Sequence, residues 1–147
     1  MNIWNKLIIT EKVRLSADQY GASNPRQLNQ LMLDCSHTPD REVFFGLFSF
    51  FYGLALQENA IQRQQLSGTI LLTLSPTSPL NLEGSVYAAT KMWDYSIKEL
   101  PWYWCKTFGK KSVIDFLSEL IPDCFDVDLK VSIETMLFWS KAYKCVT

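Results

Sequence analysis

The chain has 147 residues, with 14 lysines and arginines against 15 aspartates and glutamates and a net charge of −1. This near-neutral balance excludes a protein that is attracted as a whole to nucleic acid or to an anionic membrane. A chain of this length buries roughly two thirds of the surface that it exposes when unfolded, so residues 1–147 are predicted to form a single domain.

The first explicit helix start is Asn24-Pro25. An asparagine side chain can accept a hydrogen bond from an amide of the first turn, and proline suits the first helical position. The apolar residues that follow recur at spacings of three, one and three, which places them on one helical face. They are Leu28, Leu31, Met32 and Cys35.

A second start, Thr38-Pro39-Asp40, leads into residues 43–56, fourteen residues without a charge, five of them phenylalanine. This run is shorter than the roughly 20 apolar residues of a transmembrane helix. Many charged residues precede it, so it is not the core of an export signal, and we expect a cytoplasmic protein. A helix that is apolar all round belongs in a core. The run therefore predicts a buried central helix that continues to about Leu66.

Ser67-Gly68 predicts the end of this long helix. Residues 69–74, TILLTL, are short and partly β-branched, as in a strand. An isolated strand would have no partner, so strand, helix and irregular structure all remain open for this segment. Residues 75–79 contain two prolines and predict a loop.

The second half of the sequence reads as a series of helices from about Asn81. Pro101 marks a break or a new start, Gly109 and Pro122 mark stops, and Asp126 can cap the last helix. Apolar residues recur at helical spacing between these marks. The sequence therefore predicts an all-α, single compact domain of about six to eight helices around the Phe-rich central helix.

The four cysteines lack the spacing of a disulfide framework or of a zinc site. They are far apart and form no C-x-x-C pair, and no histidine cluster accompanies them. Free cysteine is among the most frequently buried residue types. We therefore expect reduced core thiols at Cys35, Cys105, Cys124 and Cys145.

The sequence carries no recognised catalytic or cofactor motif. His37 is the only histidine, which removes most metal sites and restricts acid–base catalysis near neutral pH. Cys35-Ser36-His37 invites interpretation as a nucleophile and base, but residues two apart in a tight connection rarely point at a common substrate. Glycine-rich phosphate loops and the G-x-S-x-G motif are also missing. We expect no enzyme, no catalytic residue, no cofactor and no metal.

Acidic residues are concentrated in residues 115–134, where the only base is Lys130. Asp123, Asp126 and Asp128 resemble the beginning of a calcium-binding loop, but the glycine turn and the terminal glutamate of such a loop do not follow. Helix capping and solvation, or a surface that faces a partner, explain the acids better. The six candidate partner-binding acids are Asp115, Glu119, Asp123, Asp126, Asp128 and Glu134.

The segment Pro101-Trp102-Tyr103-Trp104 is the other unusual feature. Successive helical residues turn by about 100°, so three adjacent aromatic side chains cannot all face the core. Trp102 and Trp104 are therefore candidate anchors for a protein partner, although core packing also explains them. Stacking on nucleic-acid bases is a poorer interpretation because no basic field accompanies the aromatics.

In size, helical composition and its acidic stretch, the chain resembles the small immunity proteins that neutralise bacterial contact-dependent growth-inhibition and related polymorphic toxins. These families share no common motif, so the resemblance transfers no residue roles. It implies a tight one-to-one complex with a cognate toxin domain, often a nuclease with a basic cleft. The acidic stretch would then imitate the charge of nucleic acid and select the basic partner.

Two other functions remain open at this level. A helical regulator or adaptor of some other cellular protein would use the same physical features. A module that binds a small molecule or a lipid would use the Phe-rich centre as an apolar pocket. A fully packed phenylalanine cluster would count against that pocket.

Overall fold

The computed structural model describes residues 3–144, and every regular element within them is helical. Eight α-helices and two 3₁₀ turns follow one another along this range, which confirms the prediction of an all-α chain with six to eight helices. They are α1 (Lys6–Tyr20), α2 (Pro25–Ser36), α3 (Asp40–Phe48), η1 (Ser49–Phe51), η2 (Leu54–Leu56), α4 (Ala60–Leu74), α5 (Leu82–Ala89), α6 (Glu99–Phe108), α7 (Lys110–Leu120) and α8 (Val127–Ala142).

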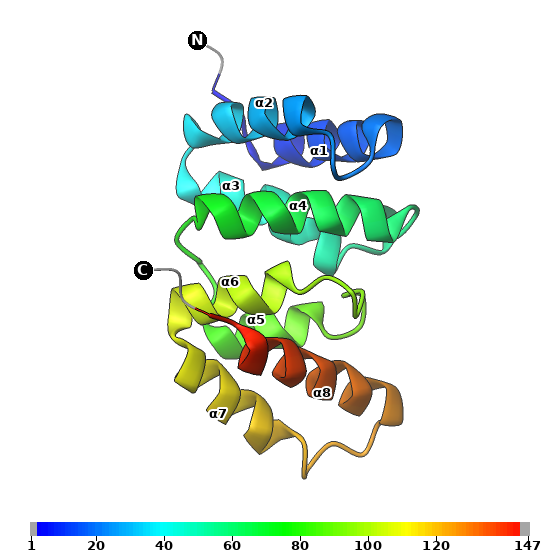
Figure 1. Cartoon of the computed structure of the whole chain (residues 1–147), viewed down its shortest axis with the longest axis vertical. Helices are drawn as coiled ribbons and strands as arrows, with labels where there is room; N and C mark the ends of the chain where they lie inside the picture. The colour runs from blue at the N-terminus through cyan, green and yellow to red at the C-terminus, as the bar shows by residue number, and fades with distance from the viewer. Residues whose placement is uncertain (1–2, 145–147) are drawn as a thin grey trace.

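The helices lie in successive levels along the long axis of the molecule. Figure 1 shows α1 and α2 at one end, α3 and α4 next, then α5 and α6, and α7 and α8 at the other end. Contacts between α1 and α3, between α4 and α6, and between α6 and α8 connect each level to the next. Within residues 3–144, none of the helices is long and apolar enough to cross a membrane.

Side-chain caps explain where several helices begin. The Oδ1 atom of Asn24 accepts the amide hydrogen of Gln27 at 3.1 Å, and Asp126 accepts that of Leu129 at 3.0 Å. Each bond satisfies an amide that has no partner inside its own helix. The predicted helix starts at these two positions are confirmed. Helix α1, which was not predicted, begins after the same kind of asparagine cap at Asn5.

The prediction of one long helix from Asp40 to about Leu66 is wrong. Helix α3 ends at Phe48, and two 3₁₀ turns separate it from α4. A Cβ atom on Gly53 would lie 2.9 Å from the carbonyl oxygen of Ser49, so the turn requires a glycine there. A continuous helix would point the phenylalanines in all directions, whereas the break buries Phe50 and Phe51 completely.

The predicted break at Ser67-Gly68 is also wrong, because α4 continues through it to Leu74. Residues 69–74 are therefore helical. A Cβ atom on Gly68 would lie 3.1 Å from the Cβ atom of Glu99 and 3.3 Å from a methyl carbon of Ile97. The glycine permits a close approach between α4 and the start of α6 instead of ending the helix.

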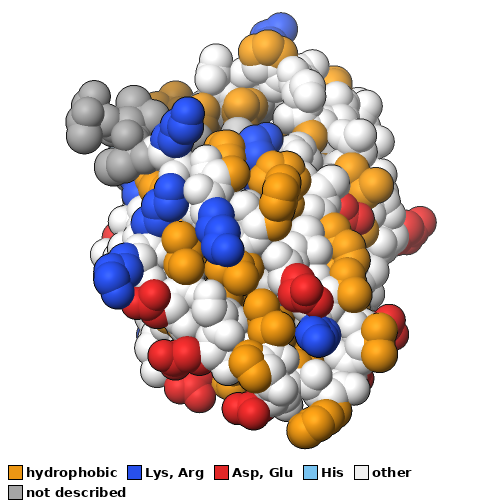
Figure 2. Space-filling view, turned by 60° about the horizontal axis from the view of Figure 1, so that its bottom comes forward, with side chains coloured by type: hydrophobic (Ala, Val, Ile, Leu, Met, Phe, Trp, Pro, Cys, Tyr) orange, Lys and Arg blue, Asp and Glu red, His pale blue; other side chains and the backbone are white. Residues whose placement is uncertain are grey.

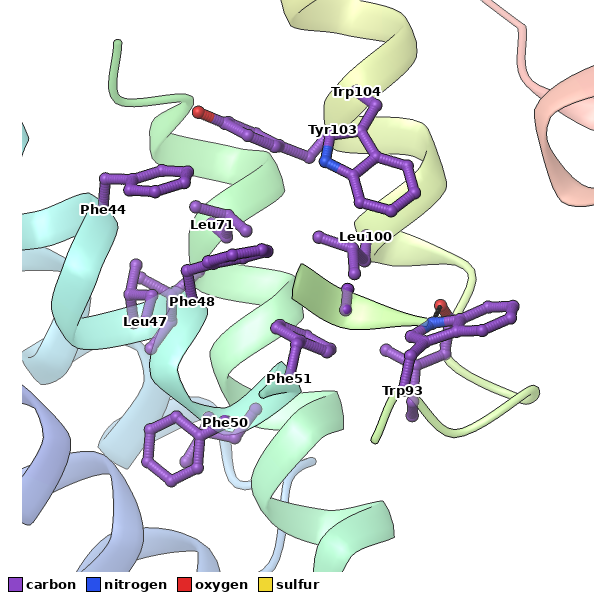
Figure 3. Packing of buried hydrophobic residues seen from close by; sticks show 14 of the residues in the cluster. Phe44, Leu47, Phe48, Phe50, Phe51, Leu71, Trp93, Leu100, Tyr103 and Trp104 are labelled. Carbon is purple, nitrogen blue, oxygen red and sulfur yellow. Dashed lines mark hydrogen bonds between the residues drawn. The ribbon is translucent and has the colours of Figure 1, made fainter. Parts of the chain in front are cut away.

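The phenylalanine run still forms the centre of the core. The rings of Phe44 and Phe48 stack with centroids 5.0 Å apart, and Phe51 lies 6.2 Å from Phe48. Figure 3 shows these rings alongside α4, with Tyr103 and Trp104 of α6 next to them. This cluster joins the third and fourth helices to the second half of the chain.

Buried polar side chains stabilise the same region. The Nε2 atom of Gln64 donates to the carbonyl oxygens of Phe50 at 3.1 Å and of Met92 at 2.8 Å, and its Oε1 atom accepts the amide hydrogen of Asp94 at 2.8 Å. One fully buried amide thereby connects η1, α4 and the loop before α6. Every buried polar atom of this side chain has a partner, which is the condition for such burial to be tolerated.

Candidate partner-binding surface

Helices α7 and α8 pack against each other and are joined by the loop 121–126. The end of this pair that contains the loop carries Glu119, Asp123, Asp126 and Asp128, all exposed. The opposite end, where α7 begins and α8 finishes, carries exposed lysines 110, 111 and 141. Figure 2 shows this face of the molecule, with most basic side chains gathered at one side and acidic ones spread over the rest of the face among hydrophobic side chains. We call the acidic part the loop end.

Helix stability does not account for this distribution of charge along α7. Lys110 and Lys111 lie in its first turn, beside the positive end of the helix dipole, and Glu119 lies beside the negative end. Both placements are unfavourable for an isolated helix. Only α8 has the favourable order, with Asp128 in its first turn and Lys141 in its last.

Two hollows lie on either side of the start of α8, and Leu129 lines both. The first has a volume of about 280 Å³ and is lined by Asp126 and Asp128, together with Lys91 and Tyr95. The second measures about 320 Å³ and is lined by Glu119 and Asp123. Four of the six predicted acids are therefore brought together around one apolar side chain. In the described part of the chain, no lysine or arginine forms an ion pair with any of these four.

The structure does not bring the other two predicted acids to the loop end hollows. Asp115 forms an ion pair with Lys111 at 2.6 Å, one turn away on α7. Glu134 is exposed on α8 but lines neither hollow. Asp115 and Glu134 are both exposed, so their contribution to a partner interface stays a prediction outside these hollows. Sequence distance along 115–134 does not show which way each helical turn points.

The predicted aromatic anchors on α6 do not form part of this surface. Trp104 is fully buried and donates its indole hydrogen to the Oγ atom of Ser85 at 2.7 Å, so its prediction as a partner contact is wrong. Trp102 is half-buried, and its indole nitrogen donates to the carbonyl oxygen of Trp139 at 2.9 Å. Both indoles hold the fold together.

Two other aromatic side chains are exposed instead. Phe125 in the loop between α7 and α8 is 94% exposed, and Phe138 on α8 is 62% exposed. Neither residue was predicted as a partner contact. Phe138 could have been found, because a helical spacing places it on the side of the last helix opposite Leu129, Ile133 and Met136.

The possible nucleophile at residues 35–37 has no chemical support in the structure. Cys35 is buried, and this burial raises its pKa to about 12, which keeps the thiol protonated near neutral pH. Cys105 is buried and Cys124 half-buried, both as free thiols, while Cys145 lies outside the described residues. Among residues 3–144, no group of three or more histidine, cysteine or acidic side chains could hold a metal ion.

The Phe-rich centre is packed, not hollow. Phe44, Phe48, Phe50 and Phe51 have no exposed surface, and several of their rings are in direct contact. Only Phe45 of the five reaches a surface hollow, which it lines with Lys6 and Arg41. This packing counts against the alternative in which these phenylalanines form a lipid or ligand pocket.

Comparison with known proteins gives no relative for this chain. No model of a known protein family matches the sequence, and searches of curated proteins and of solved structures return no significant match.

Proposed function

We propose that the chain is a non-catalytic inhibitor that captures a basic protein through the loop end of α7 and α8. The specific role proposed is that of a cytoplasmic immunity protein that neutralises a cognate bacterial toxin. The observation that supports the proposal best is the group of four carboxylates around two hollows, none of them in an ion pair within residues 3–144, together with the exposed Phe125 in the same loop.

The carboxylates favour a basic partner. Glu119, Asp123, Asp126 and Asp128 share one end of the molecule, and Lys91 is the one base that lines their hollows. A concentrated negative field speeds the encounter with a positive surface and disfavours acidic surfaces. A nuclease toxin has such a positive surface because its cleft must hold phosphates.

Phe125 supplies apolar surface for binding, which the carboxylates lack. A phenylalanine with 94% of its surface in water gives the free protein almost no packing energy. Buried in a partner, the same ring would remove apolar surface from water and slow dissociation. Asp123 and Asp126, on either side of it in sequence, would direct a basic surface toward the ring.

The proposal is tested by capture with matched charge-reversal variants. The immobilised chain should retain a basic protein from a lysate of its source, and retention should fall as salt is raised. Asp123→Lys with Asp128→Lys should abolish retention. Asp126 is left unchanged because it caps α8. Glu58→Lys with Glu83→Lys makes the same change of net charge at exposed positions elsewhere and should retain the partner.

Identification of the retained protein separates the candidate functions. A toxin domain whose activity is blocked at a one-to-one ratio supports the immunity role. For the immunity role, we expect the toxin to be encoded by a gene next to the gene of this chain. A different cellular protein supports the regulator or adaptor role, and equal retention by both double variants removes the loop end from the account.

A further inference from the structure

The outer side of α8 carries an apolar stripe that no other described segment covers. Val127, Val131 and Phe138 are 74%, 39% and 62% exposed. Their spacing of four and seven residues places them on one side of the helix, with Glu134 between them. Ser132, Met136 and Ser140 form the opposite, buried side. Because α8 lies at the end of the stack (Figure 1), its outer side is available to another molecule.

The charges along this stripe are also without partners. Lys130 and Glu134 are four residues apart, the same spacing and order as Lys111 and Asp115, which form an ion pair on α7 at 2.6 Å. Within residues 3–144, however, neither Lys130 nor Glu134 forms an ion pair, and neither does Lys141. These exposed charges remain free to meet charges of another chain.

The charges along α8 would face opposite charges on a second copy of the helix that runs in the reverse direction. From the loop end to the end of α8 their order is acid, base, acid, base, at Asp123, Lys130, Glu134 and Lys141. A second copy turned by a two-fold axis at the level of Ser132 places its Lys130 opposite Glu134 and its Lys141 opposite Asp123. Phe138 then lies near Val127 of the second copy. A parallel arrangement would instead place each charge opposite a like charge, which is unfavourable.

We infer that the outer side of α8 pairs antiparallel with α8 of a second copy of this chain. This self-association goes beyond the proposed function and shares only Asp123 with the loop end, so a failed capture experiment leaves it standing. A contact made by one helix from each copy is at the small end of specific interfaces, so a dissociation constant in the micromolar range or weaker is expected. Raised salt should weaken it further.

The test is analytical ultracentrifugation of the purified chain over a concentration series reaching the millimolar range. The wild type should pass from monomer to dimer. Phe138→Ser should remain monomeric, while Leu7→Ser, which removes a similarly exposed apolar side chain from α1, should dimerise like the wild type. Circular dichroism checks that each variant keeps its helical content.

A charge exchange tests the orientation. Lys130→Glu alone and Glu134→Lys alone each create two like-charge contacts, and each should raise the dissociation constant about 10-fold. The double variant Lys130→Glu/Glu134→Lys restores opposite charges and should return to within about 3-fold of the wild type. A wild type that is monomeric throughout, or a double variant no better than the single ones, overturns the inference.

Discussion

Phe48 in the middle of the molecule has no exposed surface, whereas Phe125 in the loop between α7 and α8 is 94% exposed. Phe48 is the last residue of α3. The centroid of its ring lies 5.0 Å from that of Phe44 and 5.4 Å from that of Tyr52. Phe125 has no ring contact among the described residues. The same residue type therefore contributes to folding in one region and remains available for binding in the other.

Polar side chains differ between the two regions in the same way. Gln64 in the middle uses all of its hydrogen-bonding atoms inside the protein. Asp123 and Asp128 at the loop end form no ion pair within residues 3–144. The comparison indicates that the residues that stabilise the fold and those that bind a partner are largely separate. Substitutions should therefore affect stability in one region and binding in the other.

The largest expected effect on stability is that of Phe48→Ala. Removing a buried phenylalanine ring loses its burial energy and leaves a cavity, so the free energy of unfolding should fall by about 3–5 kcal/mol. Phe125→Ala is the matched control and should change it by about 0.5 kcal/mol or less. Urea denaturation followed by circular dichroism measures both. Similar losses in the two variants would contradict the division between the regions.

Gln64→Leu should have the next largest effect. It leaves the carbonyl oxygens of Phe50 and Met92 and the amide of Asp94 without this partner, and each buried unsatisfied group costs about 1–3 kcal/mol. We expect a total loss of about 3 kcal/mol in urea denaturation. Gln19→Leu, at an exposed position of α1, serves as the control. A stable Gln64→Leu protein would show that the amide network is dispensable.

Within the loop end, Asp126 should differ from its neighbour Asp123. Asp126→Ala removes the cap of α8 and should lower the free energy of unfolding by about 1 kcal/mol. Asp123→Ala removes no hydrogen bond of the described structure and should change stability by less than about 0.5 kcal/mol. Thermal unfolding distinguishes the two, and equal midpoints would contradict the capping role.

A smaller effect concerns the ion pair between α1 and α4. Hydrogen bonding to Arg63, at 2.7 Å, lowers the pKa of Asp18 from its ordinary value of 3.8 to about 2. The carboxylate therefore stabilises the folded state above pH 3.8, and this contribution is lost as the pH falls to about 2. Asp18→Asn should flatten that part of the stability profile. An unchanged profile in the variant would assign the acid sensitivity to other groups.

Local signals in the sequence were sufficient for much of the fold. Asn24-Pro25 and Asp126 predicted helix starts because capping depends on residues within one turn. The break after Phe48 could not be predicted, since it depends on which rings the rest of the core can bury. Gly68 was misread for the same reason. Its role is to admit Glu99 and Ile97, which are distant in sequence.

The candidate site was predictable only in part. The exposure of Glu119, Asp123 and Asp128 follows from their charge, but their position around Leu129 depends on how α7, α8 and their loop pack. Trp104 was misassigned because a single helix does not reveal which of its sides its neighbours cover. Its burial against Ser85 depends on the position of α5.

The central claim is that the loop end serves binding and contributes little to folding. Its most direct test measures two properties of the Asp123→Lys/Asp128→Lys protein together: its unfolding midpoint and, by calorimetry, its affinity for the captured partner. We predict a midpoint within a few degrees of the wild type and an affinity at least about 100-fold weaker. An unchanged affinity, or a loss of affinity that only accompanies unfolding, would contradict the claim.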